Sequence, residues 1–74
     1  MYTAVYMGDT GRDYGAFIAG TFGTVEEAIK AVREGLKECF NHPIGGEVID
    51  EATGKIIIVI SPTGEIEEDR RENR

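Results

Sequence analysis

The stretch Ile56-Ile57-Ile58-Val59-Ile60 decides the fold of this chain. Five consecutive β-branched residues favour an extended, pleated backbone, so we expect a strand over residues 55–61. Side chains alternate between the two faces of a strand. Ile56, Ile58 and Ile60 should therefore point to one face, and Ile57 and Val59 to the other. Both faces of this strand are expected to be buried away from water.

Working outward, the flanking segments predict three more strands. Residues 2–7 and 14–21 are rich in strand formers and are separated by the turn Asp9-Thr10-Gly11-Arg12, which predicts a hairpin. Residues 47–50 predict a short third strand, and a turn over residues 51–54 joins it to the stretch at 55–61. Residues 41–46 contain one proline and two glycines, so we expect a loose connection there.

A helix is predicted between the two hairpins. Thr24 followed by Glu27 three positions later is a capping box, which places the first helical residue at Val25. Apolar residues then recur at helical spacing to about Phe40, with charged residues on the opposite side. Gly35 costs about 1 kcal/mol relative to alanine inside a helix. A close approach to the sheet or to another chain would explain Gly35, and so would a helix that tolerates glycine.

The element order β-β-α-β-β predicts an α+β fold. One helix packs on one face of a single antiparallel or mixed sheet of about four strands. A right-handed crossover between the hairpins would put two parallel strands at the centre of the sheet. Residues 1–64 form one compact domain in this prediction. Residues 65–74 form a charged tail that adds a short edge strand and is otherwise disordered.

One helix can cover only one face of such a sheet. The first two predicted strands also carry apolar residues on both sides, so a large apolar face would stay open to water. We expect a second copy of the chain to cover that face in a homodimer, with an interface built from Ile57, Val59, Phe17 and Val5. The function that follows is a non-enzymatic protein–protein interaction module.

Charge suggests a different partner. The chain has 74 residues and a net charge of −6. An acidic chain without a basic stripe lacks the electrostatic footprint of nucleic-acid binding and of binding to anionic membranes. An acidic inhibitor of a basic protein, antitoxin-like or nucleic-acid-mimicking, is therefore the first alternative, and a solvated acidic surface is the simpler explanation. The acids that would form this patch are Glu47, Asp50, Glu51, Glu65, Glu67, Glu68 and Asp69.

Cysteine usage and hydropathy indicate the compartment. Cys39 is the single cysteine, so the chain forms no internal disulfide, which fits a reducing environment. No segment resembles a signal peptide, and no apolar run approaches the roughly 18 residues that a membrane span needs. We therefore expect a soluble, cytoplasmic protein.

Three short patterns suggest chemistry, and each has a simpler explanation. Asp9-Thr10-Gly11 matches the aspartic-protease motif, but these residues also make an ordinary turn and no second such motif occurs. Residues 20–24 lead from a strand into a helix N-terminus, as phosphate-binding loops do, but the required lysine is missing. Cys39 and His42 have the spacing of half a zinc site, and two ligands are too few unless a dimer supplies four.

No catalytic residue, metal or cofactor is predicted. Ser61 and His42 are the only serine and histidine, and Ser61 begins a proline turn, so no nucleophile–base pair is expected. A small-ligand binder is the second alternative function. Three tyrosines, Tyr2, Tyr6 and Tyr14, either form a recognition patch on the first hairpin or pack within the sheet.

Three segments together resemble the beginning of HicB-type antitoxin domains. They are Tyr2-Thr3-Ala4-Val5, Tyr14-Gly15-Ala16-Phe17 and Thr24-Val25-Glu26-Glu27-Ala28-Ile29. The resemblance covers residues 2–40. The chain lacks the Pro-Gly-containing strand that this family places before the helix, and it lacks a separate DNA-binding segment. The resemblance implies a protein that neutralises a partner protein.

Overall fold

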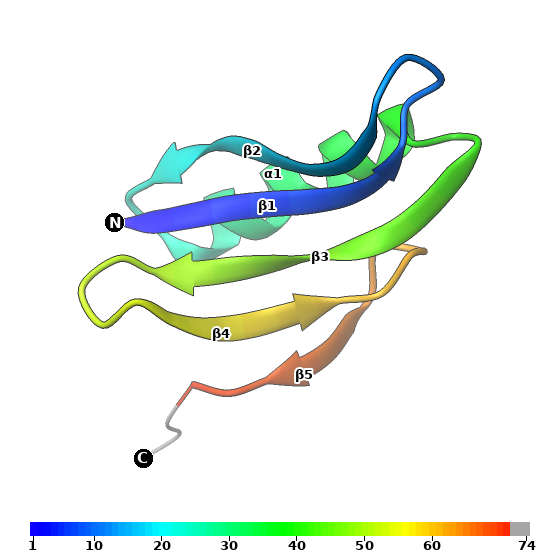
Figure 1. The fold of residues 1–74 in the computed structure, drawn as a ribbon. Coiled ribbons are helices and arrows are strands. Elements are labelled where there is room, and N and C mark those ends of the chain that lie inside the picture. The colour runs from blue at the N-terminus through cyan, green and yellow to red at the C-terminus, as the bar shows by residue number, and fades with distance from the viewer. Residues whose placement is uncertain (72–74) are drawn as a thin grey trace.

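The computed structural model describes residues 1–71, which form one sheet and one helix (Figure 1). The elements are β1 (Tyr2–Asp9), β2 (Tyr14–Phe22), α1 (Val25–Glu38), β3 (His42–Asp50), β4 (Lys55–Ile60) and β5 (Ile66–Asp69). The strands form a five-stranded sheet in the order β2-β1-β3-β4-β5, and every neighbouring pair is antiparallel. The predicted α+β fold, with one helix on one sheet, is confirmed.

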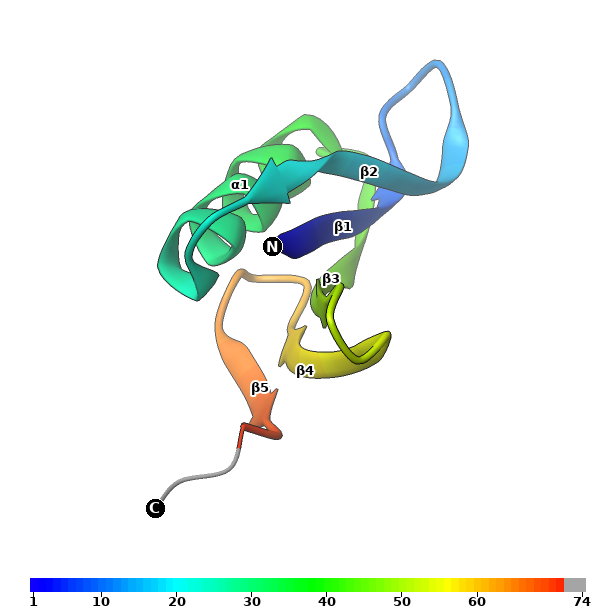
Figure 2. The ribbon, with the colours of Figure 1, turned by 90° about the vertical axis from the view of Figure 1, so that its left-hand side faces the viewer.

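The helix and the sheet form two layers. α1 packs against β1, β2 and β3. The sheet curves, so that β4 and β5 bend toward the side of the helix (Figure 2). Figure 1 looks onto the opposite face, and no described segment crosses in front of the strands there. The structure thus has one covered face and one open face.

The prediction of two parallel strands at the centre of the sheet is wrong. After α1 the chain returns beside β1, and β3 pairs with β1 in the antiparallel sense. β2 and β3 do run in the same direction, but β1 lies between them. The antiparallel form of the predicted sheet is therefore the one observed.

The capping box starts the helix as predicted. The Thr24 hydroxyl accepts a hydrogen bond from the backbone N–H of Glu27 at 3.1 Å and donates one to the Glu27 carboxylate at 3.1 Å. The helix ends at Glu38, before the predicted Phe40, because the N–H of Cys39 turns back to the carbonyl of Leu36 at 3.0 Å. Phe40 is left outside the helix and 74% exposed.

The core lies between α1 and the covered face of the sheet. Ile58 and Ile60, from the stretch that decides the fold, are 0% and 1% exposed. The long side chains of α1 fill the space above them, and β1 and β3 supply the smaller ones. The buried cluster consists of Ala4, Val25, Ala28, Ile29, Val32, Leu36, Val48, Ile58 and Ile60.

Two glycines set how closely the helix lies on the sheet. A Cβ at Gly35 would lie 2.6 Å from Cε1 of Tyr6 and closer still to other atoms of that ring. A Cβ at Gly46 would lie 2.6 Å from the carbonyl oxygen of Val5 and closer still to Val32. Real Cβ atoms do not approach other atoms this closely, so both positions need glycine. The close approach to the sheet is therefore the explanation of Gly35.

β3 is longer than the sequence indicates. It begins at His42. The prediction of a loose connection over residues 41–46 is therefore wrong for residues 42–46, which belong to the strand. The glycine that suggested a loop, Gly46, serves the contact with α1 instead. Pro43 lies beside a register shift between β1 and β3, where a missing N–H is tolerated.

Part of the predicted tail belongs to the sheet. Residues 66–69 form β5, which includes Glu68 and Asp69, and the N–H of Arg70 donates to the carbonyl of Ile57 at 2.7 Å. The disorder predicted for residues 72–74 lies outside the described residues. Within the part of the chain that the structure describes, no helix is long and apolar enough to cross a membrane.

We expect Gly35→Ala to destabilise the fold, although alanine is the better helix former. The new methyl group would collide with the Tyr6 ring. The cost of this overpacking exceeds the gain in helix propensity, so we expect the free energy of unfolding to fall by about 1–2 kcal/mol. Urea denaturation monitored by circular dichroism measures this change in the free energy of unfolding. Gly23→Ala is the matched control, because nothing lies within 4 Å of a Cβ there. A Gly35→Ala variant as stable as the parent would contradict the close packing.

Candidate interaction surface

A row of side chains crosses all five strands on the open face of the sheet. Residues directly opposite each other in neighbouring antiparallel strands point to the same face. The strand register therefore places one residue from each strand in this row. From β2 to β5 they are Ile18, Val5, Glu47, Val59 and Glu68.

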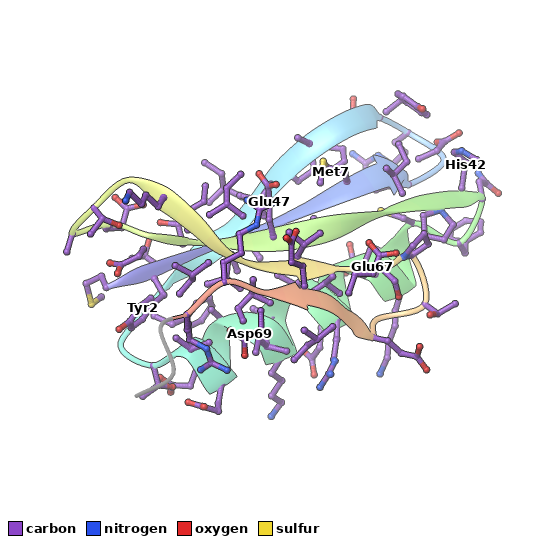
Figure 3. All side chains as sticks on the ribbon, turned by 90° about the horizontal axis from the view of Figure 1, so that it is seen from below. Tyr2, Met7, His42, Glu47, Glu67 and Asp69 are labelled. Atoms are coloured by element: carbon purple, nitrogen blue, oxygen red, sulfur yellow. The ribbon has the colours of Figure 1, made fainter. Side chains whose placement is uncertain are left out.

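The labelled side chains in Figure 3 lie on the faces that the register gives them. In Figure 3, Met7 and Glu47 lie on the open side of the sheet, whereas Tyr2 and Asp69 lie on the side of α1. The open face is apolar around Glu47, which is half-buried between the two valines of the row. It therefore combines apolar side chains with one carboxylate at its centre.

Exposure is uneven across the open face. Val5 is only 9% exposed, and Val59, Ile49 and Ile56 are half-buried. Ile18, at the β2 end of the row, is 72% exposed. The apolar surface that remains in contact with water is therefore concentrated at the β2 edge.

Ile57 does not lie where strict alternation puts it. β3 and β4 pair Val48 with Ile58 and Ile49 with Ile56, so Ile57 is the additional residue of a β-bulge. A bulge interrupts the alternation of side chains. Ile57 packs against the core on the helix side of the sheet. Its predicted place on the open face is wrong for this reason. The predicted place of Ile56 on the same face as Ile58 and Ile60 is wrong as well, because Ile56 pairs with Ile49 on the open face.

Phe17 also lies on the side of the helix. It is directly opposite Tyr6, and the two ring centroids are 5.3 Å apart. Tyr6 packs against the core beside Gly35. Of the four predicted interface residues, only Val5 and Val59 lie on the open face, and their role in an interface stays a prediction.

Two exposed apolar residues lie outside the four predicted interface residues, although Tyr14 belongs to the suggested tyrosine patch. Tyr14 is 67% and Ile18 is 72% exposed, and both belong to β2. A signal was present in the sequence, because residues 14–25 contain no charged side chain. An uncharged strand is unusual at the edge of a sheet, where charges normally protect it.

The seven acids of the predicted patch do not form one surface. Glu68 and Asp69 point to opposite faces of β5, since they pair with Val59 and Ile58 respectively. Asp50 accepts a hydrogen bond from the N–H of Ala52 at 3.0 Å, and Glu51 accepts one from the hydroxyl of Thr3. Glu65 and Glu67 are exposed near the other end of β4.

Two of these acids are paired with arginines. Glu68 lies 2.8 Å from Arg70. Asp69 binds Arg71 in a bidentate pair, with distances of 3.0 Å and 2.7 Å, and also accepts the backbone N–H of Arg71 at 3.0 Å. The pKa of Arg70 is raised first by its hydrogen bond to Glu68, and the negative charge of Glu47 contributes less. The acidic end of the sheet is thus partly neutralised from within.

The suggested aspartic-protease motif is an ordinary turn. A carboxylate oxygen of Asp9 accepts the N–H of Gly11 at 2.8 Å, and the hydroxyl of Thr10 accepts the N–H of Asp13 at 3.2 Å. Ser61 is used in the same way, because its hydroxyl contacts that of Thr63 at 2.9 Å and accepts the N–H of Glu65 at 3.1 Å. These side chains stabilise turns between strands.

Cys39 is a core residue. It is fully buried, and burial raises the pKa of its thiol, with a smaller contribution from the charge of Glu38. His42, its expected partner in a half zinc site, is exposed at the start of β3. Residues 1–71 contain no group of three or more His, Cys, Asp or Glu side chains arranged to hold a metal ion.

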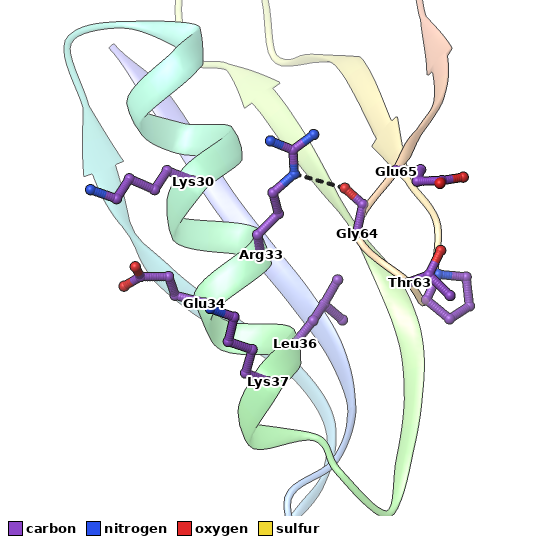
Figure 4. A pocket seen from close by; sticks show the side chains of 9 residues that line it. Lys30, Arg33, Glu34, Leu36, Lys37, Thr63, Gly64 and Glu65 are labelled. Carbon is purple, nitrogen blue, oxygen red and sulfur yellow. Dashed lines mark hydrogen bonds between the residues drawn. The ribbon is translucent and has the colours of Figure 1, made fainter.

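A hollow in the surface lies between α1 and the turn that joins β4 to β5 (Figure 4). It has a volume of about 550 Å³ and is open to solvent. Nε of Arg33 donates to the carbonyl of Gly64 at 2.7 Å and thereby ties the helix to the turn. Small-ligand sites are mostly enclosed and apolar. This hollow is open, and five of its nine lining residues are charged, with both signs present: Lys30, Arg33, Glu34, Leu36, Lys37, Pro62, Thr63, Gly64 and Glu65.

Comparison of the chain with protein-family models, with curated proteins and with solved structures found no match. The resemblance of residues 2–40 to HicB-type antitoxin domains therefore gains no support from these comparisons.

We expect the carboxyl group of Asp69 to titrate with a pKa of about 2, because the Arg71 side chain and then its backbone N–H stabilise the charged form. The pKa is lower in the folded chain than the ordinary value of 3.8, so this contribution to stability is present above about pH 4 and is lost as the pH falls toward 2. A carboxyl-detected NMR titration measures the midpoint. Arg71→Ala should return it toward 3.8, and an unshifted midpoint in the parent chain would contradict the pairing.

Proposed function

We propose that this chain is a protein–protein interaction module that acts as a homodimer and carries out no enzymatic chemistry. The observation that supports it is the exposed apolar surface on β2. Tyr14 and Ile18 are 67% and 72% exposed, the highest values among large apolar side chains in the described strands. Burying a large apolar side chain is worth about 1.5–3 kcal/mol, so covering both favours association.

The size of the chain supports association as well. A domain of about 60–80 residues buries only about 60% of the surface that its unfolded chain exposes, so its core is marginal. Small domains often gain stability from disulfides, metals or a partner chain. With a single cysteine, this chain cannot form an internal disulfide. A second copy would add buried apolar surface.

The two alternative functions have weaker support. An acidic inhibitor would present its carboxylates on one surface, but the seven acids lie on both faces of the sheet and two of them pair with Arg70 and Arg71. A small-ligand binder would present an enclosed apolar cavity. The hollow between α1 and the β4–β5 turn is open and lined by charged side chains.

Sedimentation equilibrium at several protein concentrations and at low and high salt tests this proposal. We expect a mass of twice 8.1 kDa at micromolar to millimolar concentrations. The mass should depend little on salt, because apolar contacts are not screened by ions. A clean monomer over the whole concentration range would overturn the proposal. Binding of a basic partner that collapses at high salt would favour the acidic inhibitor instead.

A further inference from the structure

We propose that two copies of the chain join edge to edge through antiparallel pairing of their β2 strands, with the two-fold axis at Ala16. The two five-stranded sheets would then form one continuous sheet. This inference rests on the proposed homodimer and names the surface through which it forms.

The first observation is the unprotected edge. β2 pairs with β1 on one side only, so the backbone N–H and C=O groups of its outer side have no partner in the described sheet. The strand is nine residues long and contains no charged residue and no proline. Edges with these properties are templates for pairing with another strand. In addition, a chain with a net charge of −6 can approach its own copy at low electrostatic cost along an uncharged strand.

The second observation is a regular run within β2. Residues 14–18 pair with β1 without interruption, and the register shifts just beyond Ile18. Tyr14, Ala16 and Ile18 alternate along this run, so they share the open face. All three are exposed. The small residue thus lies midway between two large exposed apolar side chains.

A two-fold axis at Ala16 would use this arrangement. Antiparallel pairing about residue 16 places Tyr14 of each copy opposite Ile18 of the other. Aromatic and β-branched residues are a favourable cross-strand pair. The pair would occur twice, and it would cover the two most exposed large apolar side chains of the described strands.

On the face that carries α1, the same pairing would also bring side chains of complementary size together. Phe17 would lie opposite Gly15 of the second copy. A Cβ built on Gly15 meets nothing within 4 Å, so the space beside it is open. An aromatic ring that covers a glycine in the neighbouring strand is a known stabilising arrangement in sheets.

The two helices leave room for this dimer. α1 contacts β1, β3 and β2, and so lies over β1, the strand next to the edge. In the joined sheet the two β1 strands would be three strand spacings apart, about 14 Å. A helix with its side chains is about 10–12 Å wide, so the two helices can lie side by side on the same face.

The opposite edge does not favour pairing. β5 has only four residues, of which Glu67, Glu68 and Asp69 are acidic. Pairing of β5 with its own copy would bring like charges together, and pairing of β5 with β2 would remove these acids from water. Head-to-tail pairing of β2 with β5 would also continue into an open fibre, whereas pairing of β2 with itself closes after two copies.

Disulfide trapping of Ala16→Cys tests the pairing. Directly opposed residues in antiparallel strands have Cα atoms about 4.5–5.5 Å apart, within the range that a disulfide spans. Cys39 is fully buried, so the new cysteine is the accessible thiol. We expect oxidised Ala16→Cys to migrate as a covalent dimer under non-reducing denaturing conditions. Thr21→Cys, on the same strand and exposed, is the matched control and should stay monomeric.

A second pair of variants keeps the test independent of oxidation. Ile18→Lys should raise the dimer dissociation constant at least tenfold in sedimentation equilibrium, because it places a charge opposite Tyr14. Ile66→Lys changes an exposed isoleucine on β5 and should leave the constant unchanged.

The outcomes separate the two proposals. A parent chain that is monomeric overturns the homodimer and this inference with it. A parent chain that is dimeric, with no disulfide at position 16 or with Ile18→Lys as dimeric as the parent, overturns the β2 pairing and leaves the homodimer standing. Cross-linking of Thr21→Cys in preference to Ala16→Cys would also overturn the pairing, because it requires a different axis.

Discussion

The contact between the last turns of α1 and the middle of β1 determines much of this structure. Gly35 lets the helix lie directly against the Tyr6 ring, and Gly46 lets β3 lie directly beneath Val32. These two positions bring the helix close enough to the sheet for a chain of 74 residues to bury a continuous core. Close packing of this kind makes a small core sensitive to single methyl groups. The contact also decides which face of the sheet is covered.

The single helix is too small to cover all five strands, and this explains the shape of the rest of the sheet. α1 lies over β1, β3 and β2, and the sheet curves so that Ile58 and Ile60 of β4 still reach the core. The bulge exchanges two isoleucines, because Ile57 turns to the helix side while Ile56, opposite Ile49, turns to the open face. Curvature therefore reduces the apolar surface that a single copy exposes, whereas the bulge leaves one isoleucine on each side. What remains exposed is concentrated on the uncharged edge strand β2.

Much of the fold could be predicted from local signals in the sequence. The capping box at Thr24 fixed the start of the helix, and the strand formers at residues 2–7 and 14–21 with the turn between them predicted the first hairpin. The extension of β3 to His42 could not be predicted, because Gly46 resembles a loop residue until the helix that needs it is in place. The bulge at Ile57 was equally hidden, since five β-branched residues in a row have no feature that marks the interruption. The predicted open face was therefore correct for Val5 and Val59 and wrong for Ile57 and Phe17.

Isotope-filtered NMR on a mixture of labelled and unlabelled chains tests most directly whether two copies pair through β2. It detects contacts between copies only, so it distinguishes the β2 edge from the open face without any substitution. The account predicts contacts between the Tyr14 ring of one copy and the Ile18 methyl groups of the other. Contacts between copies that are confined to Val5 and Val59, or that involve β5, would contradict it.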